Sequence, residues 1–376
     1  MDSLINAIIY VTSFLAMLSI LVFVHEWGHF IVARMNGVRV DVFSIGFGPE
    51  IWGRTDKKGT RWKFSYVPLG GYVKFFGDAS AASTPDGALD DLSEEDRKIS
   101  FHHKKLHQRA AIVFAGPFAN FIFAILILAT FFYTYGQIDT PAIISEVVEG
   151  SAADEAGMQK GDVIVAVDGT EIKRFNDVRI EVLYSAGEAI DVDVLRRGEI
   201  INLVLSPRLT KIMRDGTALL DDDGKPVELY QIGVQSSEEV VIREHGIASA
   251  LWAGTLETRV IVVQSLRGIR QMIVGTRSVK ELSGPIGIAK IAGESAKRGI
   301  DFWIRVMALV SISLGLINLF PIPLLDGGHL LYYGIEAVMG RKLSERVQEF
   351  GFRIGLAFIL GLMMLATFND ILKFNW

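Results

Sequence analysis

Three residues near the N-terminus carry the clearest chemical signal in the chain. His25, Glu26 and His29 stand in the spacing H-E-x-x-H, and positions i and i+4 of a helix lie one turn apart on the same face. Both imidazoles can therefore reach one metal ion. The glutamate can accept a proton from a water held at an open position of that ion. The pattern predicts a metal centre that performs hydrolysis.

A catalytic metal site of this kind normally has three protein ligands, so one more is needed. Asp326 is the first candidate because it follows an apolar segment, where a bare carboxylate is costly and is expected to be paired or metal-bound. Pro321 and Pro323 break the helix before it and let its side chain turn inward. The competing candidates are Glu50, His329 and three loop histidines, which also fit a basic collar beside the next apolar run: His102, His103 and His107.

The elements that must position these residues are helices in a lipid bilayer. Half of the 376 residues are apolar, and they collect in long runs separated by polar stretches, as in polytopic membrane proteins. The absence of cysteine excludes disulfides and thiolate ligands, and the net charge of −5 indicates no nucleic-acid partner. The runs predict four transmembrane helices, at residues 1–33, 109–135, 302–325 and 350–370.

Basic residues predict how these helices are oriented. Arg34 and Arg39 follow the first run, and Arg341, Lys342 and Arg346 precede the fourth. Cytoplasmic loops carry the excess of Lys and Arg. We therefore expect both termini outside the cytoplasm and the metal site toward it. The N-terminus lacks the basic region of a signal peptide, which favours an uncleaved first helix.

The segment at 34–108 is expected on the cytoplasmic side. Alternating and aromatic residues at 41–77 predict short membrane-associated β-strands with tight turns. Such strands either dip into the bilayer and offer an edge to an extended peptide, or rest on its surface as a hairpin. The candidate edge strand is Gly70, Gly71, Tyr72 and Val73. Residues 78–105 are polar and predict a solvated loop.

Residues 140–208 predict a compact α+β module inserted between the second and third helices. The pattern A-G-M-x-x-G-D-V-I-x-x-V-D-G at 156–169 resembles bacterial PDZ domains, which bind extended peptides at a sheet edge. The alternative is a spacer without a ligand. Residues 209–301 predict an extracytoplasmic linker with a polar stretch, an amphipathic helix at the membrane surface at 246–275, and a helix-breaking loop at 283–288.

The two motifs and the module together resemble the site-2 protease family, within peptidase family M50B, and most closely its bacterial RseP-type members. The resemblance implies that His25, His29 and Asp326 bind one zinc ion and that Glu26 activates water. It implies that Asn318 steadies the substrate strand or the oxyanion. It also matches Gly46–Pro49 and Gly70–Phe75 to membrane-entering β elements. The chain shows one PDZ-like module, where well-known members carry two.

The function expected from these features is an intramembrane zinc endopeptidase in a bacterial plasma membrane. By resemblance, its substrates are single-span membrane proteins, such as anti-sigma factors already trimmed by another protease, or signal-peptide remnants. One alternative is a catalytically silent membrane scaffold that acts through its PDZ-like module. A metal transporter is a weaker alternative, because the second and fourth runs supply few polar residues.

Overall fold

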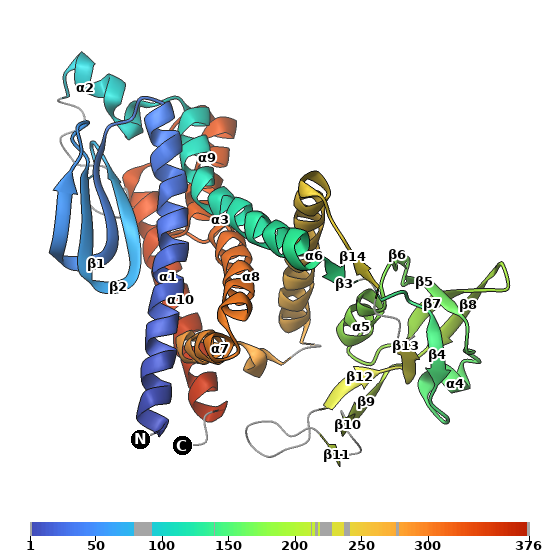
Figure 1. Cartoon of the computed structure of the whole chain (residues 1–376). Helices are drawn as coiled ribbons and strands as arrows, with labels where there is room; N and C mark the ends of the chain where they lie inside the picture. Colours follow the sequence, from blue (N-terminus) through green and yellow to red (C-terminus); the bar gives the residue numbers. More distant parts are fainter. Residues whose placement is uncertain are drawn as a thin grey trace. The chain divides into compact units, whose positions relative to one another are not determined.

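The computed structural model describes residues 2–78, 92–138, 140–211, 213–214, 217–218, 228–236, 241–275 and 278–373. The chain divides into two compact units (Figure 1). Unit 1 consists of Met1–Ala129, Leu251–Val262 and Lys280–Phe374. Unit 2 consists of Thr130–Ala250, Val263–Val279 and Asn375–Trp376.

Four helices in the described residues are long and apolar enough to cross a membrane, as the sequence predicted. They are α1 (Asp2–Met35), α3 (Leu106–Tyr135), α8 (Ile300–Asn318) and α10 (Glu345–Lys373). The start of α1 and the end of α10 lie at one end of unit 1, and α2 (Glu94–Ile99) lies at the other (Figure 1). The chain is thus built as a multi-pass membrane protein.

The third apolar helix is shorter than predicted. It ends at Asn318 rather than near residue 325, and a separate helix, α9 (Asp326–Met339), begins at Asp326. Pro321 and Pro323 lack the backbone N–H groups that would continue the helix. Leu324 has φ +112°, a conformation that is strained for a residue with a side chain. Asp326 therefore stands in the first turn of a new helix.

A single sheet fills residues 40–75. It has two long, irregular strands, β1 (Val40–Thr55) and β2 (Arg61–Phe75), rather than the several short strands predicted. The first part of β1 lies between Gly71–Phe75 on one side and Arg61–Phe64 on the other. Within the described residues, Gly71–Phe75 pairs on one side only, so it is an edge strand.

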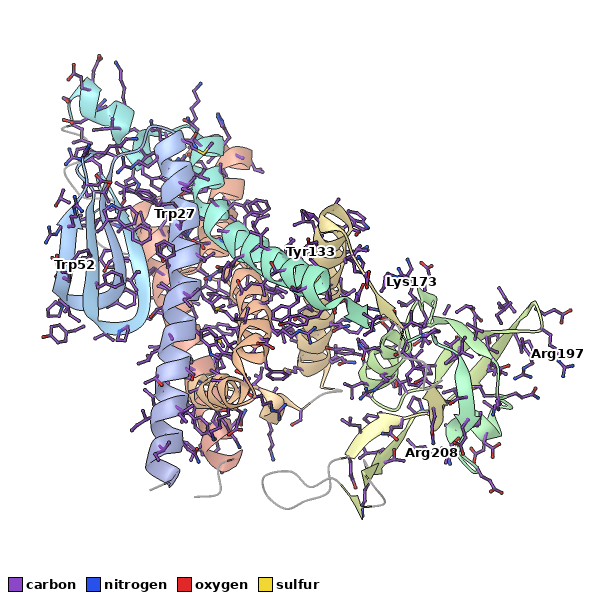
Figure 2. The ribbon with its side chains drawn as sticks, in the orientation of Figure 1. Trp27, Trp52, Tyr133, Lys173, Arg197 and Arg208 are labelled. Atoms are coloured by element: carbon purple, nitrogen blue, oxygen red, sulfur yellow. The ribbon has the colours of Figure 1, made fainter. Side chains whose placement is uncertain are left out.

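Aromatic side chains attach this sheet to α1. The Trp62 ring stacks on Phe43 at 4.5 Å and meets the Phe30 ring edge-on at 5.0 Å, between ring centroids. Trp27 of α1 contacts the same cluster, whereas Trp52 lies on the side of the sheet turned away from α1 (Figure 2). Aromatic pairs in this geometry stabilise packing beyond the area they bury. The cluster fixes the sheet beside the H-E-x-x-H turn.

The segment after the sheet is less exposed than the solvated loop predicted for 78–105. In the short helix η2 (Phe101–His103), Phe101 is buried and stacks on Phe75. The His102 Nε2 atom lies 2.8 Å from Oδ1 of the buried Asp78. The prediction of a solvated loop was therefore wrong at Phe101, while 79–91 lie outside the described residues.

A buried carboxylate joins the last helix to α7 (Pro285–Lys297). Asp370 of α10 accepts hydrogen bonds from the backbone N–H groups of Gly284 and Gly287, at 3.0 and 2.8 Å. The sequence predicted a helix-breaking loop at 283–288, but Pro285 starts a helix there. Proline suits the first helical position because its missing N–H would have no partner within the helix.

Unit 2 contains the predicted module, built on the sheet β6-β5-β7-β8. Its strands are β5 (Val163–Val167), β6 (Thr170–Glu171), β7 (Ile190–Arg196) and β8 (Glu199–Leu205). Two helices, α4 (Ala152–Glu155) and α5 (Phe175–Tyr184), accompany it. Small two-stranded sheets, all antiparallel, complete the strands: β4 (Ile144–Val147) with β13 (Val234–Ser236), β9 (Arg208–Lys211) with β12 (Glu228–Gln231), β10 (Met213–Arg214) with β11 (Thr217–Ala218), and β3 (Gln137–Ile138) with β14 (Ile242–Arg243).

The module continues past residue 208, where the sequence placed its end. Ile232 belongs to its buried core, Tyr230 and Val234 pack against that core, and β13 pairs with β4. The acidic run 221–223 lies outside the described residues. Helix α6 (Ile247–Val274) matches the predicted amphipathic helix in extent, and η3 (Val279–Glu281) precedes α7.

An ion pair between a buried carboxylate and a partly exposed arginine stabilises the module, and its removal should loosen the sheet. Arg196 donates to both carboxylate oxygens of Asp162 at 2.7 Å, and the Asp162 side chain is 1% exposed. Replacing Arg196 with methionine leaves this carboxylate without its charged partner, so we expect the module to lose about 1.5–3 kcal/mol of stability. Hydrogen exchange of the β5 and β7 amides in the intact protein measures the loss. Arg197→Met, at the exposed tip of the β7–β8 hairpin (Figure 2), is the matched control.

The same pair sets an acid limit for the module. Burial alone would raise the pKa of Asp162, but the hydrogen bonds from Arg196 and from the Gln159 amide outweigh it and hold that pKa below its ordinary value. The ionised carboxylate therefore stabilises the folded module at every pH above its unfolded pKa of about 3.9. This contribution is lost as the pH falls through the lower pKa of the folded state, where the carboxylate takes up a proton. If the β5 and β7 amides of Arg196→Met exchanged hydrogen at the wild-type rate at pH 7, the ion pair would not be what stabilises the module.

Candidate metal centre and active site

The two histidines of the H-E-x-x-H turn and the aspartate of α9 meet in unit 1. His25 Nε2 lies 3.1 Å from Asp326 Oδ2, His29 Nε2 lies 3.5 Å from Asp326 Oδ1, and the two Nε2 atoms are 3.2 Å apart. These donor atoms all lie within 4.8 Å of one another. Helix α1 supplies two of the groups because their spacing is one turn. The break after Asn318 supplies the third.

The distances fit a tetrahedral zinc ion. Ligand atoms about 2.0–2.2 Å from zinc are about 3.3–3.6 Å apart when they occupy corners of a tetrahedron, close to the 3.1–3.5 Å separations between these atoms. Asp326 Oδ2 is buried and has no hydrogen-bond partner. A buried unpaired carboxylate oxygen is costly, and a bound cation removes that cost. Two histidines and one carboxylate are also a donor set that zinc prefers.

His29 is held in the tautomer that a metal requires. Its Nδ1 atom lies 2.9 Å from the Ile112 carbonyl of α3. A carbonyl only accepts, so Nδ1 carries the proton and Nε2 keeps a lone pair directed at Asp326. The ring edge lies directly against Gly116, where a β-carbon would come within 2.2 Å of Nε2. The close approach of α3 therefore depends on glycine at this position.

Glu26 faces the same space as the three donors. It lines a cavity of about 200 Å³ together with His25, His29 and Asp326. The backbone amide of Val73 is a hydrogen-bond partner of the Glu26 carboxylate. Strand β2 thus orients the glutamate, which the sequence pattern alone did not indicate.

The remaining walls come from the edge strand and the broken helix. Gly71, Tyr72 and Val73 line the cavity, as does Asn318, whose amide Nδ2 donates to the Leu314 carbonyl at 3.0 Å. Gly70, the fourth residue of the predicted edge strand, packs against the Phe47 ring and does not line the cavity. An extended segment placed beside Gly71–Val73 would pass in front of Glu26.

The competing ligands do not join the three-donor cluster. Glu50 forms an ion pair with Arg61, and His102 pairs with Asp78. His103 contacts the Ser100 hydroxyl, while His329 lines the cavity beside Asp326. His107, at the start of α3, is also absent from the cluster.

One close neighbour of the centre received no chemical role from the sequence. Asn120 of α3 is fully buried, and its side chain lies 3.2 Å from His25 Nδ1. The position of Asn120 in an apolar run indicates a hydrogen bond to a neighbouring helix. Local spacing could not identify the partner, because His25 is 95 residues away in the chain.

Two histidines, a carboxylate and a nearby glutamate at a cavity, carried by apolar helices, define a membrane metallohydrolase. Comparison with known proteins makes the class specific. The model of peptidase family M50 matches residues 13–362, so the chain belongs to this family. It is a zinc metalloprotease.

Relatives match the chain over nearly its whole length. A protein of Agrobacterium fabrum named as a zinc metalloprotease is 45% identical over 366 residues, which cover 96% of this chain and 95% of the relative. Metalloprotease MmpA of Caulobacter vibrioides is 36% identical over 397 residues, with 99% and 98% covered. The predicted zinc metalloprotease activity is therefore confirmed at the level of the family.

Proposed function

We propose that this protein is an intramembrane zinc endopeptidase of the site-2 protease type. The observation that carries the proposal is the convergence of His25, His29 and Asp326 beside Glu26 in one cavity between apolar helices. In this proposal the first three residues bind one zinc ion and Glu26 is the general base. The family membership supports the metal and the reaction, and the apolar helices support a site within the membrane.

The residues around the cavity divide the chemical work. Bound zinc supplies Lewis acidity to a water molecule and to the scissile carbonyl. Glu26 takes the proton of the attacking water and later delivers it to the leaving nitrogen, while the Val73 amide keeps its carboxylate aimed into the cavity. One N–H of the Asn318 side chain donates to the Leu314 carbonyl, and its second N–H can donate to the developing oxyanion.

The hydrogen bonding of a helix determines what form of substrate can be cleaved. In a transmembrane helix each carbonyl is hydrogen-bonded within the helix and shielded by the turn around it. In this proposal the substrate segment unwinds before cleavage, which exposes backbone groups that cannot remain unpaired in lipid. The backbone groups of Gly71–Val73 that neither β1 nor Glu26 engages can pair with them by strand addition.

The proposed substrates are single-span membrane proteins that have already been shortened, in the manner of anti-sigma factors after a first cleavage or of signal-peptide remnants. The proposed location is a bacterial plasma membrane, with both termini and the module outside the cytoplasm. Basic residues in the last turn of α1 and shortly after it, and shortly before α10 and in its first turn, support this orientation: Arg34, Arg39, Arg341, Lys342 and Arg346. The active site then opens toward the cytoplasmic side.

Replacing Glu26 with glutamine tests the mechanism. The amide keeps the shape of the side chain but cannot accept the water proton, so cleavage of a single-span model substrate should fall about 10²–10⁴-fold. Purified protein in proteoliposomes provides both the cleavage rate and the zinc content, and the zinc should be retained. Glu349→Gln, on an exposed part of α10, is the control. Undiminished cleavage in Glu26→Gln would refute the role of Glu26 as general base, whereas absence of cleavage by the zinc-loaded wild type would favour the scaffold alternative.

We also propose that the module in unit 2 binds peptides in the manner of a PDZ domain. A groove of about 370 Å³ lies between α5 and the segment from β12 to β13. Apolar side chains from both sides line it, among them Ile180, Leu183 and Leu229. Within the described residues β12 pairs only with β9, which leaves one edge for an added strand.

A charge placed in this groove should prevent binding. Leu183→Asp introduces a carboxylate where an apolar peptide side chain would be buried, so affinity for a fluorescent peptide with an apolar C-terminus should fall at least about tenfold. Fluorescence anisotropy with the full-length protein measures the change. The control is Ile200→Asp on β8, which is 69% exposed and does not line the groove. Equal binding by both variants would remove the groove as the peptide site.

A further inference from the structure

Asn120 occupies an unusual position beside the metal centre. Its side chain is fully buried within α3, and its Nδ2 atom lies 3.2 Å from Nδ1 of His25. Its Oδ1 atom is buried and has no hydrogen-bond partner. The Asn120 backbone carbonyl accepts a hydrogen bond from the Ser311 hydroxyl at 2.8 Å, which ties this turn of α3 to α8.

The chemistry of His25 requires an acceptor at this position. To act as a ligand through Nε2, the imidazole must keep the lone pair on Nε2 and carry its proton on Nδ1. An amide NH₂ group facing Nδ1–H would bring two donors together. Half a turn about the Cβ–Cγ bond of Asn120 exchanges Oδ1 and Nδ2 without changing the space that the side chain fills. The orphaned oxygen then accepts the His25 proton.

We propose that Asn120 is a positioning residue that accepts the Nδ1–H of His25 through Oδ1 and so holds Nε2 ready for the metal. The proposal rests on the proposed function, in which His25 is a zinc ligand. It gives both histidines the same kind of support from α3, because the Ile112 carbonyl does this for His29. Such outer partners fix the tautomer and the ring orientation of metal-binding histidines.

The antiparallel crossing of α1 and α3 explains why one helix serves both rings. Asn120 lies one turn beyond Gly116, just as His25 lies one turn before His29. His29 rests on Gly116 and His25 faces Asn120. The glycine provides room for one ring, and the amide provides an acceptor for the other.

Two substitutions at residue 120 separate accepting from space filling. Asn120→Leu has a similar shape and no acceptor, so zinc affinity, measured by chelator competition with the full-length protein, should weaken about 10–100-fold. Asn120→Asp accepts from Nδ1–H and should bind zinc within about threefold of the wild type or more tightly. The absorption spectrum of the cobalt-substituted protein should be altered in Asn120→Leu and retained in Asn120→Asp. Ser311→Ala, which leaves the amide untouched, should change neither readout.

Each contrary result has a defined meaning. Wild-type zinc affinity in Asn120→Leu overturns the proposal, and so does loss of affinity in Asn120→Asp, because that pattern belongs to an amide that donates to Nδ1. If Asn120→Leu does not fold, Asn120→Asp alone decides. The ligand assignment fails separately, if His25→Ala and Asp326→Asn both retain zinc at wild-type affinity.

Discussion

Replacing Gly116 with alanine is expected to abolish zinc binding and proteolysis together. The added methyl carbon would stand 2.2 Å from His29 Nε2 and 2.4 Å from Cε1, well inside any allowed contact. His29 is also fixed from behind by the Ile112 carbonyl of the same helix, so the ring cannot move away without losing that bond. Either the ring turns out of the centre or α3 separates from α1. Zinc content and cleavage rate of the purified variant should both fall to background.

A matched substitution shows whether the effect is local. Gly361 lies in α10, a helix that is also apolar, and a β-carbon there would meet no atom within 4 Å. Gly361→Ala should therefore keep its zinc and its activity. Gly116→Ala that retained one zinc ion per chain would show that α1 and α3 can separate at little cost, and the close-packing argument would fail.

Gly355→Ala should disturb the centre from the opposite side. A β-carbon at this position of α10 would lie 1.7 Å from the Pro323 carbonyl oxygen. Pro323 belongs to the non-helical segment that delivers Asp326, so the clash must displace that segment or α10. A ligand moved by about 1 Å can lower a rate about 10²-fold, and overpacking typically costs about 1–3 kcal/mol. We expect slower cleavage, weaker zinc binding and a lower melting temperature.

The three readouts give this second substitution a specific signature. Displacement of Asp326 alone weakens zinc binding and slows cleavage in proportion, whereas a general loss of stability would reduce the amount of folded protein and leave zinc per folded chain unchanged. Gly361→Ala, six residues further along α10, is again the control. Normal zinc affinity in Gly355→Ala would mean that the Asp326 segment is not held by α10.

The sequence predicted the parts of the site that follow from local geometry. The spacing of His25 and His29 determines their common face on any helix. Pro321 and Pro323 signalled the break that brings Asp326 inward, although the helix ends earlier than expected and restarts at the aspartate. Long apolar runs predicted the four membrane helices because burial in lipid leaves a strong compositional signal.

The parts that were missed depend on tertiary contacts or on turn context. The first turn of α9 contains Gly327 and Gly328, residues that weaken a helix prediction, yet both are buried against the preceding segment. Proline at 285 suggested a broken helix, but at the first position it begins one. Ile232 lies beyond a polar stretch and joins the module core just before β13, the strand that pairs with β4 about 90 residues earlier. The support of His25 by Asn120 has the same non-local character.

The edge strand beside Glu26 has a consequence for selectivity. In strand addition at Gly71–Val73, the substrate would be bound through its main-chain N–H and C=O groups, which every residue except proline presents in the same way. Gly71, which lines the cavity, offers no side chain to discriminate between sequences, so only Tyr72 and Val73 of this strand can do so. Under the proposed mechanism, a bound segment is therefore selected largely by how readily its backbone gives up internal hydrogen bonds. The expected cleavage site then depends on the local helical stability of the substrate more than on a consensus sequence.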